Sequence, residues 1–274
     1  MHTSSTDVRD TGTAAAGGFA TEASRQDNLI PLDGPTVVIE LAGIRFLVDP
    51  TFDPVQEYPI GDRSLVKTTN PTWSTDQLGA VDAVLLSHDQ HPDNLDHAGR
   101  EFLTTVPLTL TTPLAAQRLG GSAVGLEPWS TYRVGTVTVV AVPAQHGPDG
   151  SEGLTGPVTG FVLVAPSERH VYVSGDNASL RIVTEIAKRF ARLDVAVLFA
   201  GAARTPLVNG YLTLTSEQAA AAAEILGRPK VLAAHTNGWG HFTQDGATFR
   251  AAFETAGLAG LLLPVTPGSK VALP

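Results

Sequence analysis

The sequence predicts an α/β protein whose β-sheets are covered by helices. Apolar and β-branched runs of strand length alternate along the chain with longer segments of helical character. Hydrophobic residues make up 43% of the 274 residues, which is ample for a large core. Several predicted strands end directly in a histidine or an aspartate. A functional site is therefore expected at the sheet edge where these strand ends meet.

Residues 1–30 are predicted to form a flexible N-terminal arm, and residues 31–274 a single domain. The arm is rich in Thr, Ser, Ala, Gly and Asp and has hardly any large apolar side chain. Such a composition cannot offset the entropy lost on ordering.

The domain opens with a predicted hairpin. Residues 36–40 and 44–48 are β-rich, and the second run ends in Asp49-Pro50. Asp49 is then either a turn residue before proline or a carboxylate that orients a ligating histidine. Residues 51–80 have few periodic runs, and a loop of this length is usually functional. It is a candidate wall or lid of a site, with surface decoration as the alternative, and Tyr58 and Trp73 within it are candidate pocket residues.

The stretch from 81 to 100 has the densest cluster of polar residues. An apolar run at 84–86 predicts a buried strand, and a helix is predicted over 95–104; between them stand His88, His91, Asp93 and Asn94. These side chains share one strand-to-helix turn, where they can converge on a point. Imidazole and carboxylate together suit Zn²⁺ and also Fe²⁺ or Mn²⁺. For Asp93 and Asn94 the alternative role is to cap the following helix.

Two later strands lead to further candidate ligands. After a predicted strand at 107–111 and a helix at 113–119, a β-branched strand over 133–142 leads to His146. A hairpin over 157–165 and 169–173 leads to Asp176, ahead of a helix predicted over 178–192. Asp176 is either the N-cap of that helix or a carboxylate able to bridge two metal ions.

The last third of the chain repeats this pattern. A strand at 194–200 precedes a loop with Arg204, and Thr215 or Ser216 is placed to cap an alanine-rich helix that ends near 226. A strand over 230–234 then ends in His235, and Trp239 and His241 follow in a glycine-punctuated loop. A helix over about 244–256 and two terminal strands around 261 and 271 complete the prediction. Arg204 and Trp239 are candidate pocket residues by loop position alone.

Composition excludes several classes of function. The chain has no cysteine, so thiolate clusters, disulfides and a cysteine nucleophile are ruled out. Its net charge of −9 argues against a nucleic-acid partner. No apolar run is long enough for a membrane span, and the start lacks the pattern of a secretory signal, so a cytoplasmic location is expected. A phosphate-binding loop of the G-x-x-x-x-G-K-[ST] type and a G-x-S-x-G nucleophile elbow are both missing from the sequence.

The ordered set of candidates resembles the five motifs of the metallo-β-lactamase superfamily, which are matched here by Asp49, residues 88–94, His146, Asp176 and His235. The resemblance implies a four-layer αββα sandwich with a metal site at one edge of its two sheets, and it runs from about residue 32 to the C-terminus. Within the superfamily, LTLTSEQA at 212–219 and VLAAH at 231–235 resemble the ascorbate phosphate lactonase-like branch. That branch is similar to bacterial lactonases and to phosphodiesterases acting on lipids. It therefore implies metal-dependent hydrolysis of a lactone, ester or phosphodiester.

The chain departs from the family in its most informative motif. The usual pattern is H-x-H-x-D-H, whereas residues 88–94 read H-x-x-H-x-D-N. If the inserted residue bulges at Asp89-Gln90, the resemblance assigns the first metal to His88, His91 and His146, the bridge to Asp176, and the second metal to Asp93 and His235. Asn94 then replaces a histidine of the family pattern. Like Asp49, it would hold the ligating side chains in place without binding the metal itself. Since an amide oxygen is a weak zinc ligand, the second site is expected to be weakened, selective for a harder ion, or rebuilt with His241.

The implied activity is hydrolysis of a small-molecule substrate by a metal-activated water, with one or two Zn²⁺ ions or with Mn²⁺ or Fe²⁺. Asp93 would orient the nucleophile or take its proton, and His241 is the second candidate for proton transfer. Two alternatives stay open: a non-hydrolytic, oxidoreductase-like metalloenzyme, and a metal- or ligand-binding protein that has lost catalysis on the same fold. Assembly into a homo-oligomer is also left open.

Overall fold

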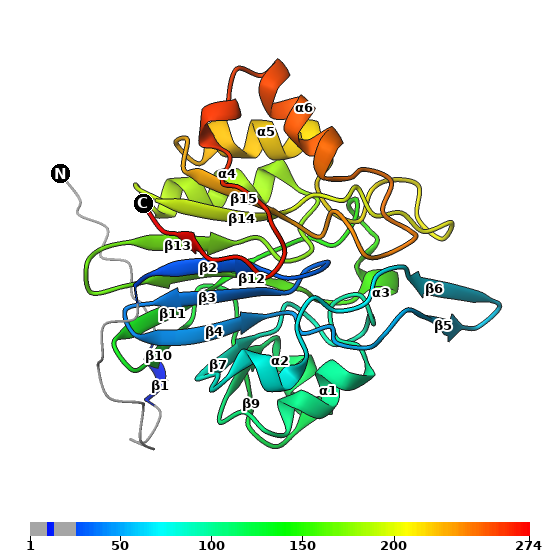
Figure 1. The fold of residues 1–274 in the computed structure, drawn as a ribbon, viewed down its shortest axis with the longest axis horizontal. Helices are drawn as coiled ribbons and strands as arrows, with labels where there is room; N and C mark the ends of the chain where they lie inside the picture. The colour runs from blue at the N-terminus through cyan, green and yellow to red at the C-terminus, as the bar shows by residue number, and fades with distance from the viewer. Residues whose placement is uncertain (1–9, 14–25) are drawn as a thin grey trace.

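Two β-sheets lie face to face at the centre of the molecule, and helices cover their outer faces (Figure 1). The computed structural model describes residues 10–13 and 26–274. The remaining part of the predicted arm, residues 1–9 and 14–25, lies outside the described residues. The last residues of that arm contribute to strand β2.

The first sheet has the strand order β1-β10-β11-β12-β13-β14-β15. Strands β10 to β13 are antiparallel neighbours, whereas β13, β14 and β15 run parallel, as expected where helices connect them. The strands are β1 (Asp10–Thr13), β10 (Thr131–Val134), β11 (Val137–Pro143), β12 (Thr159–Val164), β13 (His170–Val173), β14 (Val195–Phe199) and β15 (Lys230–Ala234).

The second sheet has the order β16-β2-β3-β4-β7-β8-β9, with parallel pairing from β4 to β9. A separate hairpin, β5–β6, projects from the body of the molecule (Figure 1). The strands are β2 (Asn28–Pro31), β3 (Val37–Leu41), β4 (Ile44–Val48), β5 (Gln56–Ile60), β6 (Arg63–Lys67), β7 (Ala83–Leu85), β8 (Thr109–Thr111), β9 (Ala123–Gly125) and β16 (Val271–Ala272).

Helices form the two outer layers of the sandwich. In Figure 1, α4, α5 and α6 lie above the first sheet, and α1 and α2 lie below the second. The α-helices are α1 (His97–Leu103), α2 (Pro113–Leu119), α3 (Glu152–Thr155), α4 (Leu180–Arg189), α5 (Ser216–Ile225) and α6 (Gly246–Thr255), with 3₁₀ turns η1 (Thr75–Leu78) and η2 (Ala259–Leu261). In the described part of the chain, none of the helices has the length and apolar character needed to cross a membrane.

The strands are almost wholly apolar because both faces of each sheet are buried. Successive side chains of a strand point to opposite faces, so Phe46 of β4 packs between the sheets, whereas Leu47 packs on the α1 side. In β12, Phe161 likewise faces the other sheet, and Val162 faces α4 and α5. Three apolar layers thus separate four layers of secondary structure, which confirms the predicted αββα sandwich.

Three expected elements differ from the structure. The single strand predicted over 133–142 is a hairpin, because Gly135, with φ of 57°, turns the chain between β10 and β11. The predicted long loop at 51–80 contains the β5–β6 hairpin, whose turn begins at Gly61 with φ of 62°. The strand expected around 261 is the 3₁₀ turn η2, and only the strand at 271 forms.

Candidate metal centre

The predicted ligands come together at one edge of the sandwich. Each follows the end of a strand, and parallel strands such as β4 and β7, or β13 and β15, present their carboxyl ends on the same side. The strand ends and the residues that follow them are β4 with Asp49, β7 with His88, β11 with His146, β13 with Asp176, and β15 with His235.

Three histidines form the first cluster. His91 Nδ1 lies 2.8 Å from His88 Nε2 and 3.1 Å from His146 Nε2. His88 and His146 are buried, and His91 is half-buried. Burial lowers the pKa of His88 well below its usual value, with a further lowering from His91 and His146; burial and His146 likewise lower the pKa of His91. The lowered pKa values of His88 and His91 favour the neutral form of these rings, which is the form that binds a metal ion.

In two of these rings, the Nδ1 atom faces away from the cluster and has a hydrogen-bond partner. His146 Nδ1 donates to the carbonyl of Leu212 at 2.8 Å. His88 Nδ1 lies 3.0 Å from Ser87 Oγ, which donates to Asp49 Oδ2 at 2.6 Å. Since Nδ1 carries the proton in both rings, the lone pair of each Nε2 points into the cluster.

The second cluster contains Asp93, Asp176 and His235, and His241 lies beside it. Asp93 Oδ2 is 3.2 Å from His235 Nε2 and 3.0 Å from His241 Nε2. Burial raises the pKa of Asp93, but the nearby His241 and the hydrogen bonds from both imidazoles outweigh it and hold the pKa well below the usual value. For His235, burial lowers the pKa, and Asp176 and Asp93 raise it by more. The Asp93 carboxylate is thus ionised.

Asp176 joins the two clusters. Its Oδ2 lies 3.5 Å from His146 Nε2, and its Oδ1 lies 3.6 Å from His235 Nε2. The residue is fully buried, and Oδ2 accepts no hydrogen bond from the described residues. A buried carboxylate oxygen without a partner is costly unless a cation neutralises it. The donor set of imidazole nitrogens and carboxylate oxygens therefore fits two divalent ions with Asp176 between them.

Asn94 supports the carboxylates through its amide nitrogen. Nδ2 donates to Asp49 Oδ2 at 3.0 Å and to Asp176 Oδ1 at 3.2 Å. The opposite amide orientation would place Oδ1 against two carboxylates, so the nitrogen must face them. Burial raises the pKa of Asp49 to about 7, despite hydrogen bonds from Ser87 and Asn94 that lower it. Asp49 reaches the His88 ring through Ser87, which donates to Asp49 and lies 3.0 Å from His88 Nδ1.

The alternative capping roles are excluded by the caps that form. Asp96 is the N-cap of α1 and accepts from the Gly99 amide at 2.8 Å, so Asp93 and Asn94 are free of that role. Ser179 caps α4, which likewise releases Asp176.

Two arginines hold Asp89, the residue after the first histidine of the motif, a feature that sequence reasoning missed. The Asp89 side chain is 3% exposed and accepts from Arg118 Nε at 3.0 Å, while its carbonyl accepts from Arg100 at 2.9 Å. Asp89 therefore faces α1 and α2 and not the metal cluster. The segment Asp89-Gln90, which we call the bulge, leads directly to His91, which lies against the other two histidines.

A cavity of about 340 Å³ opens over the clusters and is lined by His91, Asp93, His146 and His241. Of the four predicted pocket residues, Arg204 lines it. Tyr58, Trp73 and Trp239 do not, because they pack inward: Tyr58 donates to Asp53, and its ring lies 5.3 Å from that of the buried Trp239. Trp73 packs against the core beneath the second sheet. Residues 60–65 of the hairpin do form a wall of the cavity, as expected for a wall or lid.

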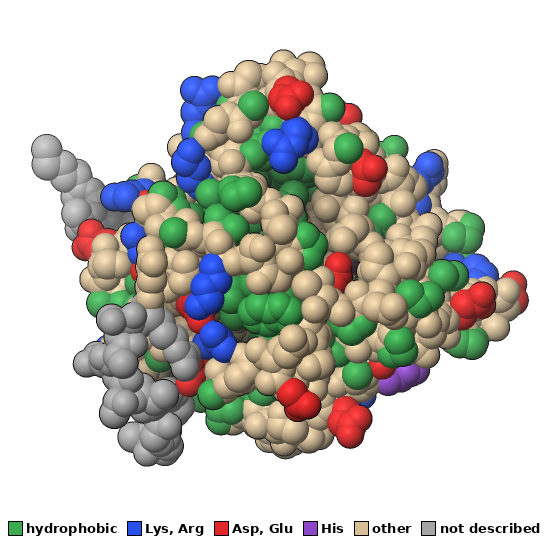
Figure 2. Space-filling model, viewed as in Figure 1, with side chains coloured by type: hydrophobic (Ala, Val, Ile, Leu, Met, Phe, Trp, Pro, Cys, Tyr) green, Lys and Arg blue, Asp and Glu red, His purple; other side chains and the backbone are tan. Residues whose placement is uncertain are grey.

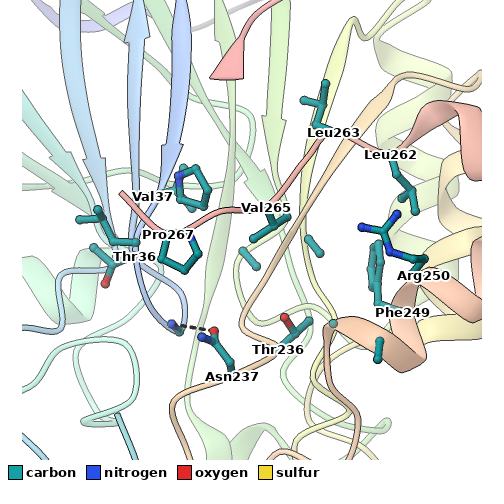
Figure 3. A pocket seen from close by; sticks show the side chains of 17 residues that line it. Thr36, Val37, Thr236, Asn237, Phe249, Arg250, Leu262, Leu263, Val265 and Pro267 are labelled. Atoms are coloured by element: carbon teal, nitrogen blue, oxygen red, sulfur yellow. Dashed lines mark hydrogen bonds between the residues drawn. The ribbon is translucent and has the colours of Figure 1, made fainter. Parts of the chain in front are cut away.

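A second cavity of similar size lies away from this chemistry (Figure 3). It is bordered by Val37, Phe249, Arg250 and Val265, and Asn237 Oδ1 accepts from the Gly34 amide beside it at 3.1 Å. Its lining includes none of the clustered histidines and aspartates.

Comparison with known proteins identifies the family. A family model described as "Beta-lactamase superfamily domain" matches residues 44–236. A "UPF0173 metal-dependent hydrolase" of Methanosphaerula palustris is 30% identical over 194 residues, covering 67% of this chain and 81% of the relative.

Solved structures share the fold. "A possible metal-dependent hydrolase" from Veillonella parvula has a TM-score of 0.80 at 17% identity and covers 91% of this chain and 100% of its own. The isothiocyanate hydrolase from Delia radicum gut bacteria has a TM-score of 0.78 at 23% identity, covering 90% and 99%. The family match covers the strands that carry nearly all of the clustered residues, and this chain belongs to the beta-lactamase superfamily as a metal-dependent hydrolase of the metallo-β-lactamase fold.

Proposed function

We propose that this enzyme hydrolyses a lactone, ester or phosphodiester at a centre for two metal ions, with Zn²⁺ as the first candidate and Mn²⁺ or Fe²⁺ as the others. The observation that carries the proposal is the placement of Asp176, whose two oxygens face the two clusters. Imidazole and carboxylate donors at the floor of an open cavity are typical of hydrolytic metal sites.

The clusters divide the ligands between the two positions. His88, His91 and His146 would hold the first ion, Asp93 and His235 the second, and Asp176 would contact both. A bound divalent ion lowers the pKa of a coordinated water and polarises the oxygen of the scissile bond.

His241 is the group placed to move a proton. It lines the cavity, its side chain is 14% exposed, and its Nε2 donates to Asp93 Oδ2. Asp93 fixes the orientation of this ring. A substrate in the cavity would lie next to His241: the ring could take the proton that the attacking water releases, with Asp93 stabilising the resulting imidazolium, and then return a proton to the leaving oxygen.

The test combines metal content with hydrolysis. The protein would be treated with chelator, reloaded separately with Zn²⁺, Mn²⁺ and Fe²⁺, and assayed on a γ-lactone, on 4-nitrophenyl acetate and on bis-4-nitrophenyl phosphate. We expect about two bound ions and hydrolysis of at least one substrate class. Asp176→Asn should lose most of the activity and part of the bound metal.

His170→Gln is the matched control, because His170 stands at the opposite end of β13 and its Nδ1 donates to the carbonyl of Arg192, away from the clusters. Its metal content and rate should equal those of the wild type. Full metal loading without hydrolysis of any of the three substrates would overturn the proposal, and oxygen consumption by the iron form would then favour the oxidoreductase alternative.

His241→Gln separates proton transfer from metal binding. If His241 supplies the leaving-group proton, this variant keeps its metal but loses rate, and the loss is largest for substrates with poorly acidic leaving groups. Loss of one bound ion in this variant would instead make His241 a ligand.

A further inference from the structure

The cavity over the metal clusters has an unusual rim for an acidic protein. Its walls come from the β5–β6 hairpin, from α3 and from the loop after β14. Figure 2 shows hydrophobic side chains lying next to both Lys or Arg and Asp or Glu side chains on the hairpin that projects at the right. The character of this rim bears on the substrate, which the metal ligands alone leave open.

Large apolar side chains gather on the rim. Leu154 of α3 is 62% exposed, Leu207 of the loop is 57% exposed, and Ile60 of the hairpin is 39% exposed, yet all three line the same cavity. Single exposed apolar residues are normal on protein surfaces. Three of them from separate elements around one opening indicate a surface that a ligand covers.

Two arginines face the same space. Arg63 donates from Nη1 to Thr205 Oγ1 at 3.0 Å, and its acidic neighbour Asp62 is 3.8 Å away with a side chain that is 97% exposed. The Arg204 guanidinium lies over the Tyr211 ring at 5.3 Å, and none of the described carboxylates pairs with it. The Arg63–Thr205 bond ties the hairpin to the loop beside Arg204, so both positive charges stay at one side of the opening.

This arrangement is informative because the whole chain carries a net charge of −9. Some other surface arginines have carboxylate partners, such as Arg181 with Glu185. Arg63, by contrast, has only the loose contact with the exposed Asp62, and Arg204 has no carboxylate partner among the described residues. A guanidinium that lines a cavity without such a partner is suited to a planar anion.

We infer that the substrate is a compact anionic amphiphile. Its hydrocarbon portion would pack on Leu154 and Leu207, its carboxylate or phosphate would lie between Arg63 and Arg204, and its hydrolysable bond would face His91 and His241. The cavity volume of about 340 Å³ limits the molecule to a small one. The inference rests on the proposed function for the hydrolysable bond, but the binding it requires can be measured without turnover.

The experiment is calorimetric titration of zinc-loaded protein with unreactive ligands: butanoate, hexanoate, hexyl phosphate, 1-hexanol and hexylammonium. We expect hexanoate to bind more tightly than butanoate, by about fourfold per methylene. We also expect the two anions to bind more tightly than the alcohol and the ammonium ion. A preference for hexyl phosphate over hexanoate would identify phosphate as the anion, and the reverse would identify carboxylate.

Variants test whether the anionic group of the ligand contacts the two arginines and whether its hydrocarbon chain contacts Leu154. Arg63→Gln and Arg204→Gln should each weaken hexanoate about tenfold and leave 1-hexanol unchanged, since a hydrogen bond to a charged group is lost. Leu154→Ser should weaken both ligands. Arg192→Gln is the control, because Arg192 pairs with Asp194 outside the cavity and should change neither.

The inference is overturned if hexylammonium binds as well as hexanoate, if chain length has no effect, or if both arginine variants bind hexanoate like the wild type. These outcomes are independent of hydrolysis. A protein that binds hexanoate through Arg63 and Arg204 but cleaves no substrate would contradict the proposed function and leave the inferred ligand class standing.

Discussion

Arg118→Gln should weaken metal binding without touching a ligand. Arg118 contacts both oxygens of Asp89, with Nε at 3.0 Å from Oδ2 and 3.2 Å from Oδ1. Asp89 begins the bulge that brings His91 to His88 and His146. Without Arg118, the buried carboxylate keeps only the more distant Arg100 guanidinium, at 3.9 Å. The bulge would then shift so that Asp89 reaches water, and His91 would shift with it.

The expected loss of stability depends on how far the Arg118–Asp89 pair is buried. A hydrogen bond to a charged group contributes roughly 1.5–3 kcal/mol, but the Arg118 side chain is 43% exposed and solvent screens the pair, so the loss of stability should be about 1 to 2 kcal/mol. Support groups of this kind typically change metal affinity by about 10- to 100-fold. Because Arg118 acts through Asp89 on one of three histidines, we expect the lower end, about tenfold.

The assay is competition for Zn²⁺ with a chromogenic chelator, alongside urea unfolding of metal-stripped protein. Arg192→Gln is the control, since Arg192 makes a comparable pair with Asp194 far from the clusters. Arg118→Lys should fall between wild type and Arg118→Gln, because it keeps the charge but not the two-point contact. An Arg118→Gln protein that loses stability but binds Zn²⁺ with wild-type affinity would refute the idea that the bulge positions His91.

Three further predictions concern stability. Lys67→Met should lower the free energy of unfolding by about 3 kcal/mol in urea, because the Lys67 Nζ to Asp96 Oδ2 pair at 2.8 Å is almost fully buried and Asp96 would keep an uncompensated charge; an unchanged midpoint would contradict this. Glu40→Gln should be destabilising at pH 7: burial raises the pKa of Glu40, but hydrogen bonds from Arg45, Lys270 and Asn28 outweigh it and hold the pKa below 4.5. The ionised Glu40 contributes its full stabilisation at pH values above its pKa in the unfolded chain, and this stabilisation is lost as the pH falls through its lower pKa in the folded protein. The difference in unfolding free energy between wild type and Glu40→Gln should therefore narrow below about pH 4.5, and a difference that does not change with pH would show that the charge is not involved. Chelation should lower the thermal midpoint of the wild type more than that of Asp176→Asn, since the unpaired Oδ2 depends most on a cation; equal shifts would contradict it.

The sequence predicted the positions of the clustered residues well because strand ends converge by geometry. Asp49, His88 and His235 each follow a short apolar run, and a buried strand leaves its next residue at the sheet edge whatever else the fold does. Helix capping can also be predicted from the local sequence: Thr215 is the N-cap of α5 and forms a capping box with Gln218.

Contacts across long sequence distances could not be predicted. The sequence gives Asp89 no partner, because Arg118 lies 29 positions away on α2. Loop position predicts that Tyr58 and Trp239 line the pocket, but it does not tell whether a ring faces the cavity or the interior. Both turn inward, and the shorter hairpin side chains Ile60 and Leu65 line the cavity instead.

The two departures from the family motif are best explained together. The motif has one residue more than the family pattern between His88 and His91, and Asp89 in this segment is held by Arg118 on the side away from the clusters, so it adds no ligand. Asn94 uses its amide nitrogen to bond two carboxylates, while its Oδ1 is buried and accepts no hydrogen bond from the described residues. An amide oxygen is a weaker ligand than the imidazole that the family pattern has at this position, and His241 is a further histidine whose Nε2 lies 3.0 Å from Asp93. With Asn94 holding the carboxylates in place, His241 stands between the second cluster and the open cavity, where it can act on a substrate as well as on Asp93.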